Sequence, residues 1–360
     1  MNKQKIKNKA CQPSQILKSR EEIGKGAYGV VYRGCLNKQC KKVVAMKNSK
    51  ENLTAEYKIA ELLANMRVPE PYAHAKCKRP TRNVMYSEYV NGKPLKNHIG
   101  DDITPVKLRA LICQVLITLY NIKQKYPSFR HNDLHLGNVL VEKTTDKKMK
   151  FRNNIEINTE GVEARINDFG LSKIQGYNNP LINKNNFKEK YGIYPGNHEM
   201  YDIHFFLNAV YGEIIKREGY MKTKEFIKRI LPLEYLTNES SVVRNFRLRS
   251  DVKHERLPSF ESVFRDPYFR DKKINITQIL KAKVPVKPPM VPPKKVTPVN
   301  QNAAKQKAMA VLAAMRNKQL KKPLPKKITP VNQNAAKKKA MAVLAAMKNK
   351  QLKKPLPKKK

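Results

Sequence analysis

Short apolar runs bounded by turn residues predict strands in the first part of the chain. Residues 23–32 read as a strand, a glycine-rich turn and a second strand, because the residues after the glycines are β-branched or aromatic. Residues 43–47 are an apolar segment that ends in a lysine and predict a further strand. The alternative for the first pair is an ordinary β-hairpin without a binding function, since a glycine pattern that stands alone is a weak signal.

Helical periodicity begins after these strands. Apolar residues recur at helical spacing within residues 51–66 and predict a helix: Ile59, Leu62, Leu63 and Met66. A longer helix begins at Thr104 and Pro105, where the threonine hydroxyl can cap the first turn and proline suits the first helical position. The apolar stripe that follows is that of a core helix, and the stretch from Leu108 to Ile122 is too short to span a bilayer.

The two ends of the chain differ from its middle. Residues 1–15 are rich in lysine and asparagine and predict a disordered arm. Prolines crowd after residue 284 and predict a stiff, extended linker over residues 271–293. A 32-residue basic repeat follows, because residues 294–325 and 326–357 differ at only three positions. Two copies are too few for a self-supporting repeat fold.

Net charge points to the kind of partner. The formal charge is +45, and residues 281–360 hold 23 lysines or arginines and no acidic residue, which leaves +22 for residues 1–280. Such a field favours polyanions. Each repeat holds one potential helix, residues 302–320 and 334–352, with an alanine-rich face flanked by lysines. We expect residues 294–360 to be either a solvated tail or helices that fold on a polyanion, nucleic acid first and an anionic membrane second.

Cysteine usage indicates the compartment. The five cysteines are odd in number and irregularly spaced, and fit neither a zinc site nor a disulfide framework. Cys35 and Cys40 could meet across a hairpin, but two reduced thiols in a reducing compartment are the prediction. No apolar segment follows the basic N-terminus, so no secretory signal is expected. The sequence therefore predicts a soluble, intracellular protein without a transmembrane segment.

One loop carries the chemistry. Residues 131–138 read His-Asn-Asp-Leu-His-Leu-Gly-Asn and place a carboxylate and an amide five positions apart. A carboxylate can orient an attacking hydroxyl and an amide oxygen can hold a divalent cation, which suits phosphoryl transfer. Asp-Phe-Gly follows at residues 168–170, and the glycine-rich turn and Lys47 precede it in the right order. Together these features resemble the protein kinase superfamily over roughly residues 17–270, and predict a kinase domain over residues 16–270.

The resemblance implies a fold and two cofactors. The fold would be α+β and bilobal, with a β-rich N-lobe over about residues 16–90 and a helical C-lobe over about residues 91–270. ATP and Mg²⁺ would be the cofactors. Asp133 would be the proton acceptor, while Asn138 and Asp168 would hold magnesium.

The same resemblance assigns the ATP contacts. Lys47 would grip the α- and β-phosphates and needs a glutamate from the following helix. Glu56 is chosen over Glu61, because Glu56 shares the inward face of that helix. Residues 85–92 resemble the hinge between the lobes, and the small Ser87 would be the gatekeeper of an enlarged adenine pocket. The other expected nucleotide contacts are Ile23, Gly24, Lys25, Gly26, Ala27, Tyr28, Gly29, Val30, Val31, Glu88 and Val90.

Several positions depart from the family pattern. Asn132 stands where the family most often has arginine, and His135 stands where serine/threonine kinases usually carry lysine. Residues 143–160 lengthen the segment before Asp-Phe-Gly and predict an inserted, solvated loop. No Ala-Pro-Glu follows, although residues 201–207 resemble the helix whose buried aspartate, here Asp202, ties down the catalytic loop.

These departures leave the substrate open. The favoured interpretation is a divergent serine/threonine protein kinase, similar to those of large DNA viruses of the iridovirus type, acting in the host cytoplasm or the virion. The loop also resembles small-molecule phosphotransferases of the aminoglycoside and choline kinase kind. From another class, a nucleic-acid-binding protein with an inactive kinase domain is the alternative, although the presence of Lys47, Asp133, Asn138 and Asp168 argues against it.

Overall fold

The chain divides into two compact units, residues 1–291 and 292–360, and the structure described below lies in the first. It is a computed structural model that describes residues 3–26, 29–78, 81–100, 102–151, 155–177, 179–182, 200–239, 243–248 and 257–270. The predicted proline-rich linker and both basic repeats fall outside these residues.

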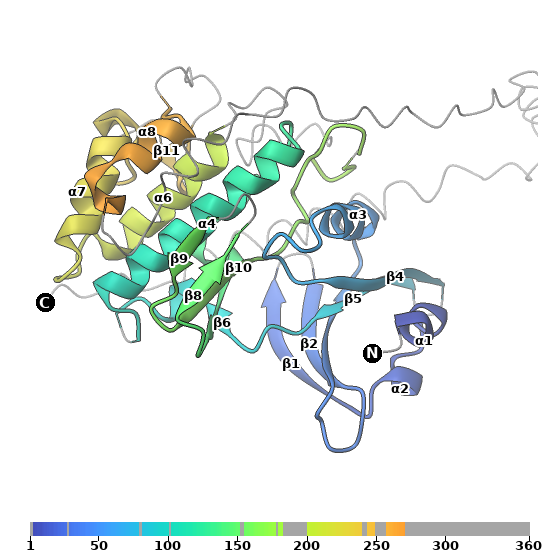
Figure 1. The fold of residues 1–360 in the computed structure, drawn as a ribbon. Coiled ribbons are helices and arrows are strands. Elements are labelled where there is room, and N and C mark those ends of the chain that lie inside the picture. Colours follow the sequence, from blue (N-terminus) through green and yellow to red (C-terminus); the bar gives the residue numbers. More distant parts are fainter. Residues whose placement is uncertain are drawn as a thin grey trace, which may run out of the picture. The chain divides into compact units, whose positions relative to one another are not determined.

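A five-stranded antiparallel sheet forms the N-lobe, with strand order β1-β2-β3-β5-β4 (Figure 1). Helix α3 (Thr54–Leu62) lies between β3 and β4 in the sequence. The strand predictions for residues 23–32 and 43–47 are confirmed, while the predicted helix over residues 51–66 is shorter than its apolar pattern indicates. The strands are β1 (Ser19–Gly26), β2 (Gly29–Cys35), β3 (Val43–Ser49), β4 (Pro71–Lys78) and β5 (Thr81–Glu88).

Two short N-terminal helices pack on this sheet, so the prediction of a disordered arm over residues 1–15 is wrong. Helix α1 (Lys3–Asn8) lies beside β4, and helix α2 (Pro13–Ile16) follows it (Figure 1). Ile6 and Ala10 are buried in one cluster with sheet residues that include Val44, Met46 and Tyr86. The Tyr86 hydroxyl donates to the Ala10 carbonyl at 3.2 Å. A few apolar residues suffice here because the sheet supplies the rest of the buried surface.

The cysteines also differ from expectation, because four of them are paired. Cys11 is bonded to Cys77 of β4 and Cys35 to Cys40, with Cα separations of 5.4 and 4.8 Å that suit disulfides. Cys113 is buried as a free thiol. The prediction of reduced thiols is therefore wrong, and the cysteines do not indicate a reducing compartment. The longer-range pair joins residues 66 positions apart, a separation that local spacing does not reveal.

Helices dominate the C-lobe, as the bilobal α+β class requires (Figure 1). They are α4 (Pro105–Lys125), α6 (Tyr201–Ile214), α7 (Met221–Ile230) and α8 (Phe260–Arg265), with single 3₁₀ turns at Leu95–Asn97, Leu136–Asn138, Leu233–Tyr235 and Pro267–Phe269. A small sheet with order β10-β7-β6 and the two-stranded hairpin β11-β12 also belong to this lobe. These strands are β6 (Lys93–Pro94), β7 (Val139–Lys143), β10 (Val162–Ile166), β11 (Val243–Arg244) and β12 (Arg247–Leu248).

Helix α4 is the central helix of this lobe. The Thr104 hydroxyl accepts a hydrogen bond from the Lys107 N–H at 3.4 Å, which confirms the predicted cap. By length and composition alone α4 is a candidate membrane span among the described residues, contrary to the expectation that it is too short. However, 78% of its apolar window is buried inside the molecule, as expected of a core helix.

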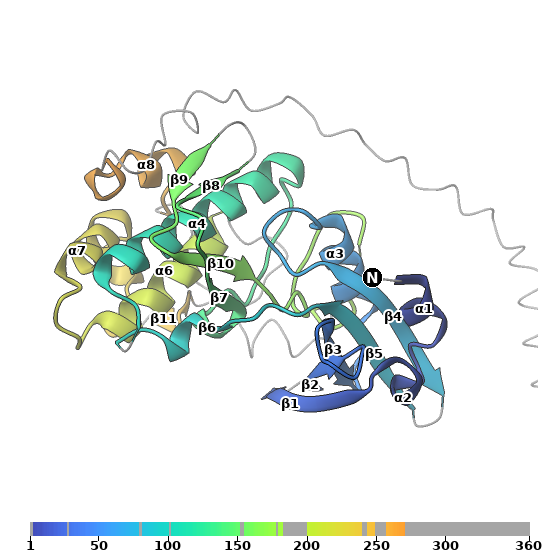
Figure 2. The same cartoon turned by 60° about the horizontal axis from the view of Figure 1, so that its bottom comes forward.

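The insertion before Asp-Phe-Gly is a packed hairpin, so the prediction of a solvated loop is wrong. Strands β8 (Lys148–Lys150) and β9 (Glu156–Asn158) pair antiparallel and lie beside α4 in both views (Figures 1 and 2). Met149 and Ile157 face the same core as α4 and are buried. Alternation of polar and apolar residues over segments of three was too short to identify these strands from the sequence.

Candidate active site

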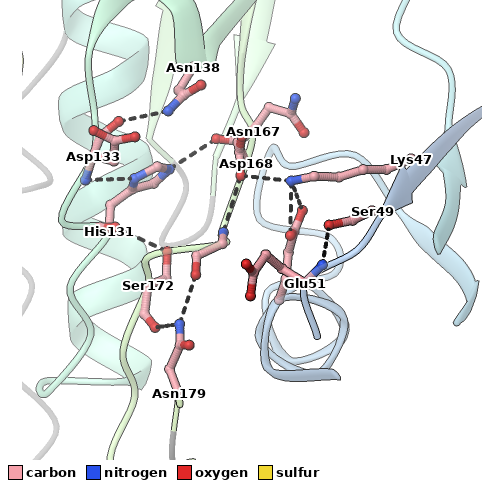
Figure 3. Close-up of polar contacts among 12 residues, drawn as sticks. Lys47, Ser49, Glu51, His131, Asp133, Asn138, Asn167, Asp168, Ser172 and Asn179 are labelled. Atoms are coloured by element: carbon pink, nitrogen blue, oxygen red, sulfur yellow. Dashed lines mark hydrogen bonds and ion pairs between the residues drawn. The ribbon is translucent and has the colours of Figure 1, made fainter. Parts of the chain in front are cut away.

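Lys47 reaches from the central strand β3 towards the C-lobe. Because side chains alternate along a strand, Val44 and Met46 face the N-terminal helices and Lys47 faces the other way. Its ammonium group lies 2.8 and 2.9 Å from the two carboxylate oxygens of Glu56 on α3. It also donates to the Asp168 carboxylate at 3.1 Å and so connects the N-lobe to the C-lobe (Figure 3).

The positive charge of Lys47 interacts favourably with the carboxylates of both Glu56 and Asp168. Burial by itself would lower the pKa of Lys47, but the carboxylates of Glu56 and Asp168 outweigh it and raise that pKa above its usual value. Burial likewise acts to raise the pKa of Asp168, yet Lys47 and the Gly170 N–H hold it below the usual range. Lys47 is therefore a cation and Asp168 an anion at neutral pH.

Glu56 and Glu61 occupy opposite sides of α3. Glu56 is buried against Lys47, whereas Glu61 is exposed and pairs with Lys58 at 2.8 Å. The structure thus brings Lys47 and Glu56 together, as the helical face of residues 59 and 63 predicts. The functional role of this pair stays a prediction.

Asp168 sits in a strained turn. Its φ of 61° lies in the left-handed region, which non-glycine residues rarely adopt. The Gly170 N–H donates to its carboxylate at 3.2 Å, and Asn179 donates to the Gly170 and Ser172 carbonyls at 2.9 and 3.0 Å (Figure 3). Asn179 therefore fixes the segment after Asp-Phe-Gly, a role that the sequence did not reveal.

Helix α6 anchors the loop at residues 131–138. The carboxylate of Asp202 is buried and accepts hydrogen bonds from the backbone N–H groups of His131 and Asn132, both at 2.8 Å. This confirms the prediction that Asp202 ties down the loop. Asn132 has a φ of 64°, so the loop turns sharply just before Asp133. The side chain of Asn132 anchors the turn by donating to the Leu171 carbonyl at 2.8 Å.

His131 and Asn138 orient Asp133 from either side. The Asp133 N–H donates to Nδ1 of His131 at 3.3 Å, and Nε2 of His131 lies 3.0 Å from the Asn167 carbonyl (Figure 3). His131 is buried against Phe169, as expected for a packing residue. The amide nitrogen of Asn138 donates to the Asp133 carbonyl at 2.8 Å, so its oxygen is left as an acceptor.

The glycine-rich turn and the hinge are formed as the sequence indicates. Ala27 and Tyr28 lie outside the described residues, but β1 and β2 pair up to Gly26 and Gly29. Gly29 must be glycine, because an added Cβ would overlap the carbonyl of Asn48. Among the described residues, no atom outside the adjoining backbone lies within 4 Å of an added Cβ at Gly24 or Gly26, so this backbone faces open space. A backbone that approaches a phosphate needs such room.

The hinge segment leaves the N-lobe at the end of β5. Glu88 is fastened at this point, since its N–H donates to the Glu70 carbonyl at 2.7 Å and its carboxylate accepts from the Glu70 N–H at 3.1 Å. Gly92 packs so closely on β7 that an added Cβ would overlap the Val141 carbonyl. Val90 is buried between these two points. Adenine contacts of Glu88 and Val90 stay predictions.

Residues 17–191 match the protein kinase domain. This part of the chain is similar to the protein kinase family. A relative from Acanthamoeba polyphaga mimivirus, named as a serine/threonine-protein kinase, is 28% identical over 211 residues, which is 54% of this chain and 44% of the relative. A second mimivirus protein with the same description is 31% identical over 117 residues, 28% of this chain and 29% of that protein. One from Dictyostelium discoideum is 37% identical over 116 residues, 29% and 9% of the two chains. The chain spans less than half of the length of these curated relatives.

One side chain in contact with Asp133 was not predicted from the sequence. Arg247, which follows the turn of the β11–β12 hairpin, donates to the Asn132 carbonyl and to the Asp133 carboxylate. His135 lies on the other side, with Nε2 3.8 Å from Asp133 and Nδ1 accepting the Gly137 N–H at 3.0 Å. Burial lowers the pKa of His135, although Asp133 opposes this. The one sequence signal for Arg247 was indirect: a histidine stands where the kinase loop usually carries lysine.

Proposed function

We propose that the chain is a protein kinase that transfers the γ-phosphoryl group of Mg-ATP to serine or threonine hydroxyls of proteins. The observation that carries this proposal is the contact between Lys47 of the N-lobe and Asp168 of the C-lobe. It joins residues 121 positions apart and completes a chain of contacts that includes Glu56. An inactive relative has no need to keep one cation and two acidic side chains together in such an arrangement, since removing charged groups from water is costly.

Asp133 is the group that would accept the proton of the substrate hydroxyl. Its backbone is fixed by His131 and Asn138, and its loop by Asp202, so the carboxylate is held before substrate arrives. A fixed carboxylate contributes to rate because no further ordering is needed in the transition state. Lys47 would hold the α- and β-phosphates, with Glu56 keeping its ammonium group in place.

The residues present also fit magnesium. Asp168 offers an ionised carboxylate and Asn138 a free amide oxygen, and hard oxygen ligands are what Mg²⁺ requires. Among the described residues no group of three or more His, Cys, Asp and Glu side chains could hold a metal by itself. This suits an ion bound by one carboxylate, one amide and the oxygens of a nucleotide. Magnesium supplies charge neutralisation on the phosphates when bound.

Protein hydroxyls are the acceptor that we favour. The mimivirus and Dictyostelium relatives are named as serine/threonine-protein kinases, which supports the same substrate class here. The loop resemblance to small-molecule phosphotransferases makes a direct assay of the product necessary. The test is transfer of labelled phosphate from Mg-ATP to a mixture of acidic and basic proteins, followed by acid hydrolysis.

The outcomes of this assay are distinct. Labelled phosphoserine or phosphothreonine that falls steeply in Asp133→Asn, but persists in the surface variant Asp102→Asn, would support the proposal. Transfer to water-soluble amines or alcohols but to no protein would favour a small-molecule kinase. Binding of ATP with no transfer at all would favour the alternative of an inactive kinase domain.

We also propose that residues 294–360 tether the kinase to polyanions. The support is charge alone: residues 281–360 carry 23 basic and no acidic residues. A protein that neutralises phosphates releases counterions, so its affinity for a short DNA duplex should fall steeply as salt rises. The matched control replaces the lysines and arginines of residues 294–357 with glutamine. An equal affinity for that variant, or a flat response to salt, would contradict the tether.

A further inference from the structure

Arg247 is built into the site more firmly than a surface arginine would be. One guanidinium nitrogen, Nη1, donates to the Asn132 carbonyl, and the other, Nη2, donates to Oδ1 of Asp133. The guanidinium also lies over the ring of Phe205, 4.5 Å from its centre. Only 11% of the side chain is exposed. Planar stacking and two fixed acceptors are the setting in which arginine is not replaceable by lysine.

The hairpin that carries Arg247 has a strained turn. Asn245 and Phe246 connect β11 to β12, and both have positive φ, 49° and 65°. Positive φ at both central residues is the pattern of a type I′ turn, which favours asparagine and glycine. A phenylalanine there is sterically costly, and such strain persists only where the surroundings hold it.

Phe246 is held by α6, the helix that carries Asp202. Its ring lies 6.3 Å from that of Phe205, and it fills the space where Gly212 lacks a side chain. An added Cβ at Gly212 would overlap the Phe246 ring. Helix α6 therefore fixes the catalytic loop twice: directly through Asp202, and indirectly by placing Phe246 and Arg247.

The second connection places a positive charge next to Asp133. The serine/threonine kinase loops that residues 131–138 resemble usually carry a lysine at the place of His135. Here His135 already uses Nδ1 as an acceptor from the Gly137 N–H, and its Nε2 is 3.8 Å from Asp133. Arginine, by contrast, keeps its charge at every physiological pH. Within the described residues, Arg247 is the permanent cation in contact with Asp133.

We propose that Arg247 is the positioning residue that takes over the task of the missing loop lysine. It holds Oδ1 of Asp133 and leaves Oδ2 for the hydroxyl of the substrate. It also fixes the Asn132 carbonyl, at the residue where the loop adopts its strained turn. This inference rests on the proposed kinase function. It adds to the site a residue that lies more than 100 positions after Asp133 in the sequence.

The test compares three variants of the full chain in the phosphate transfer assay. Arg247→Ala should lower kcat on the order of a hundredfold, because a displaced reacting group costs about that factor, with the KM for ATP unchanged. Arg247→Lys should recover little of this loss, since an ammonium group cannot span both acceptors. Arg229→Ala is the matched control: Arg229 forms a similar two-pronged pair with Asp266, at 2.9 and 3.0 Å, on the same lobe.

Two further readouts separate positioning from a purely structural role. Added ethylguanidine should raise the kcat of Arg247→Ala several-fold and leave Arg229→Ala unchanged. In the Asp133→Asn background, Arg247→Ala should cause no further loss, because Arg247 acts through Asp133.

Several results would overturn the inference. A rise in kcat on removing Arg247 would show that it blocks the site. Fully additive losses with Asp133→Asn, or a loss shared equally by Arg229→Ala, would show that Arg247 only supports the fold. Absence of transfer by the wild-type chain would instead overturn the proposed function, and this inference with it.

Discussion

Replacing Asp202 by alanine would remove the anchor between α6 and the catalytic loop. The buried Asp202 carboxylate accepts two backbone N–H groups at 2.8 Å each, and no water can reach them easily. A hydrogen bond to a charged group contributes about 1.5–3 kcal/mol, so Asp202→Ala should reduce the free energy of unfolding by roughly 3–6 kcal/mol. Asp202→Asn keeps one acceptor oxygen and should cost about half as much.

In Asp202→Ala, kcat for phosphate transfer should fall together with the free energy of unfolding. Asn132 has a strained φ of 64°, and without the anchor its backbone is free to relax. Because Asp133 is the next residue, its carboxylate would move, and a shift of about 1 Å costs on the order of a hundredfold in kcat.

Urea unfolding measured by circular dichroism gives the free energies, and initial rates of phosphate transfer give kcat. The control is Asp102→Asn, because Asp102 is 66% exposed and its pair with His98 is a surface contact worth at most about 1 kcal/mol. A loss below about 1 kcal/mol for Asp202→Ala, or one no larger than that of the control, would refute the reasoning.

Three other predictions follow from the structure. Glu56→Gln should lower the initial rate of phosphate transfer by at least about tenfold, because Lys47 loses one of its two carboxylate partners. A rate equal to that of the exposed variant Glu61→Gln would contradict this. The double variant Cys11→Ser/Cys77→Ser should lose roughly 4 kcal/mol of unfolding free energy, because the disulfide restricts the unfolded chain over a long loop. Thiol titration of the denatured, non-reduced protein checks the pairing, and five free thiols would disprove it. Because burial lowers the pKa of His135, the folded protein binds this proton less readily than the unfolded chain. Its contribution to stability should therefore decline as pH falls through about 6.5, a decline that urea unfolding should find reduced in His135→Gln.

Local pattern by itself determined a large part of the kinase domain. Short apolar runs and turn residues placed the strands over residues 23–32 and 43–47, and a hydroxyl followed by proline placed the start of α4. Helical spacing was enough to put Glu56, rather than Glu61, on the side of α3 that meets the lysine. These features depend on interactions within a few residues along the chain, so the sequence holds the information locally.

Only the tertiary structure decided what covers the N-lobe and what completes the site. Residues 3–16 are too polar to predict as a folded segment, yet Ile6 is buried because the sheet presents an apolar face to it. Cys11 finds Cys77 over a separation of 66 residues, and Arg247 finds Asp133 over 114. Contacts at such distances are set by how helices and sheets pack, and neither periodicity nor spacing in the sequence encodes them. The packing of α6 therefore gives the catalytic loop a cation that its own sequence lacks.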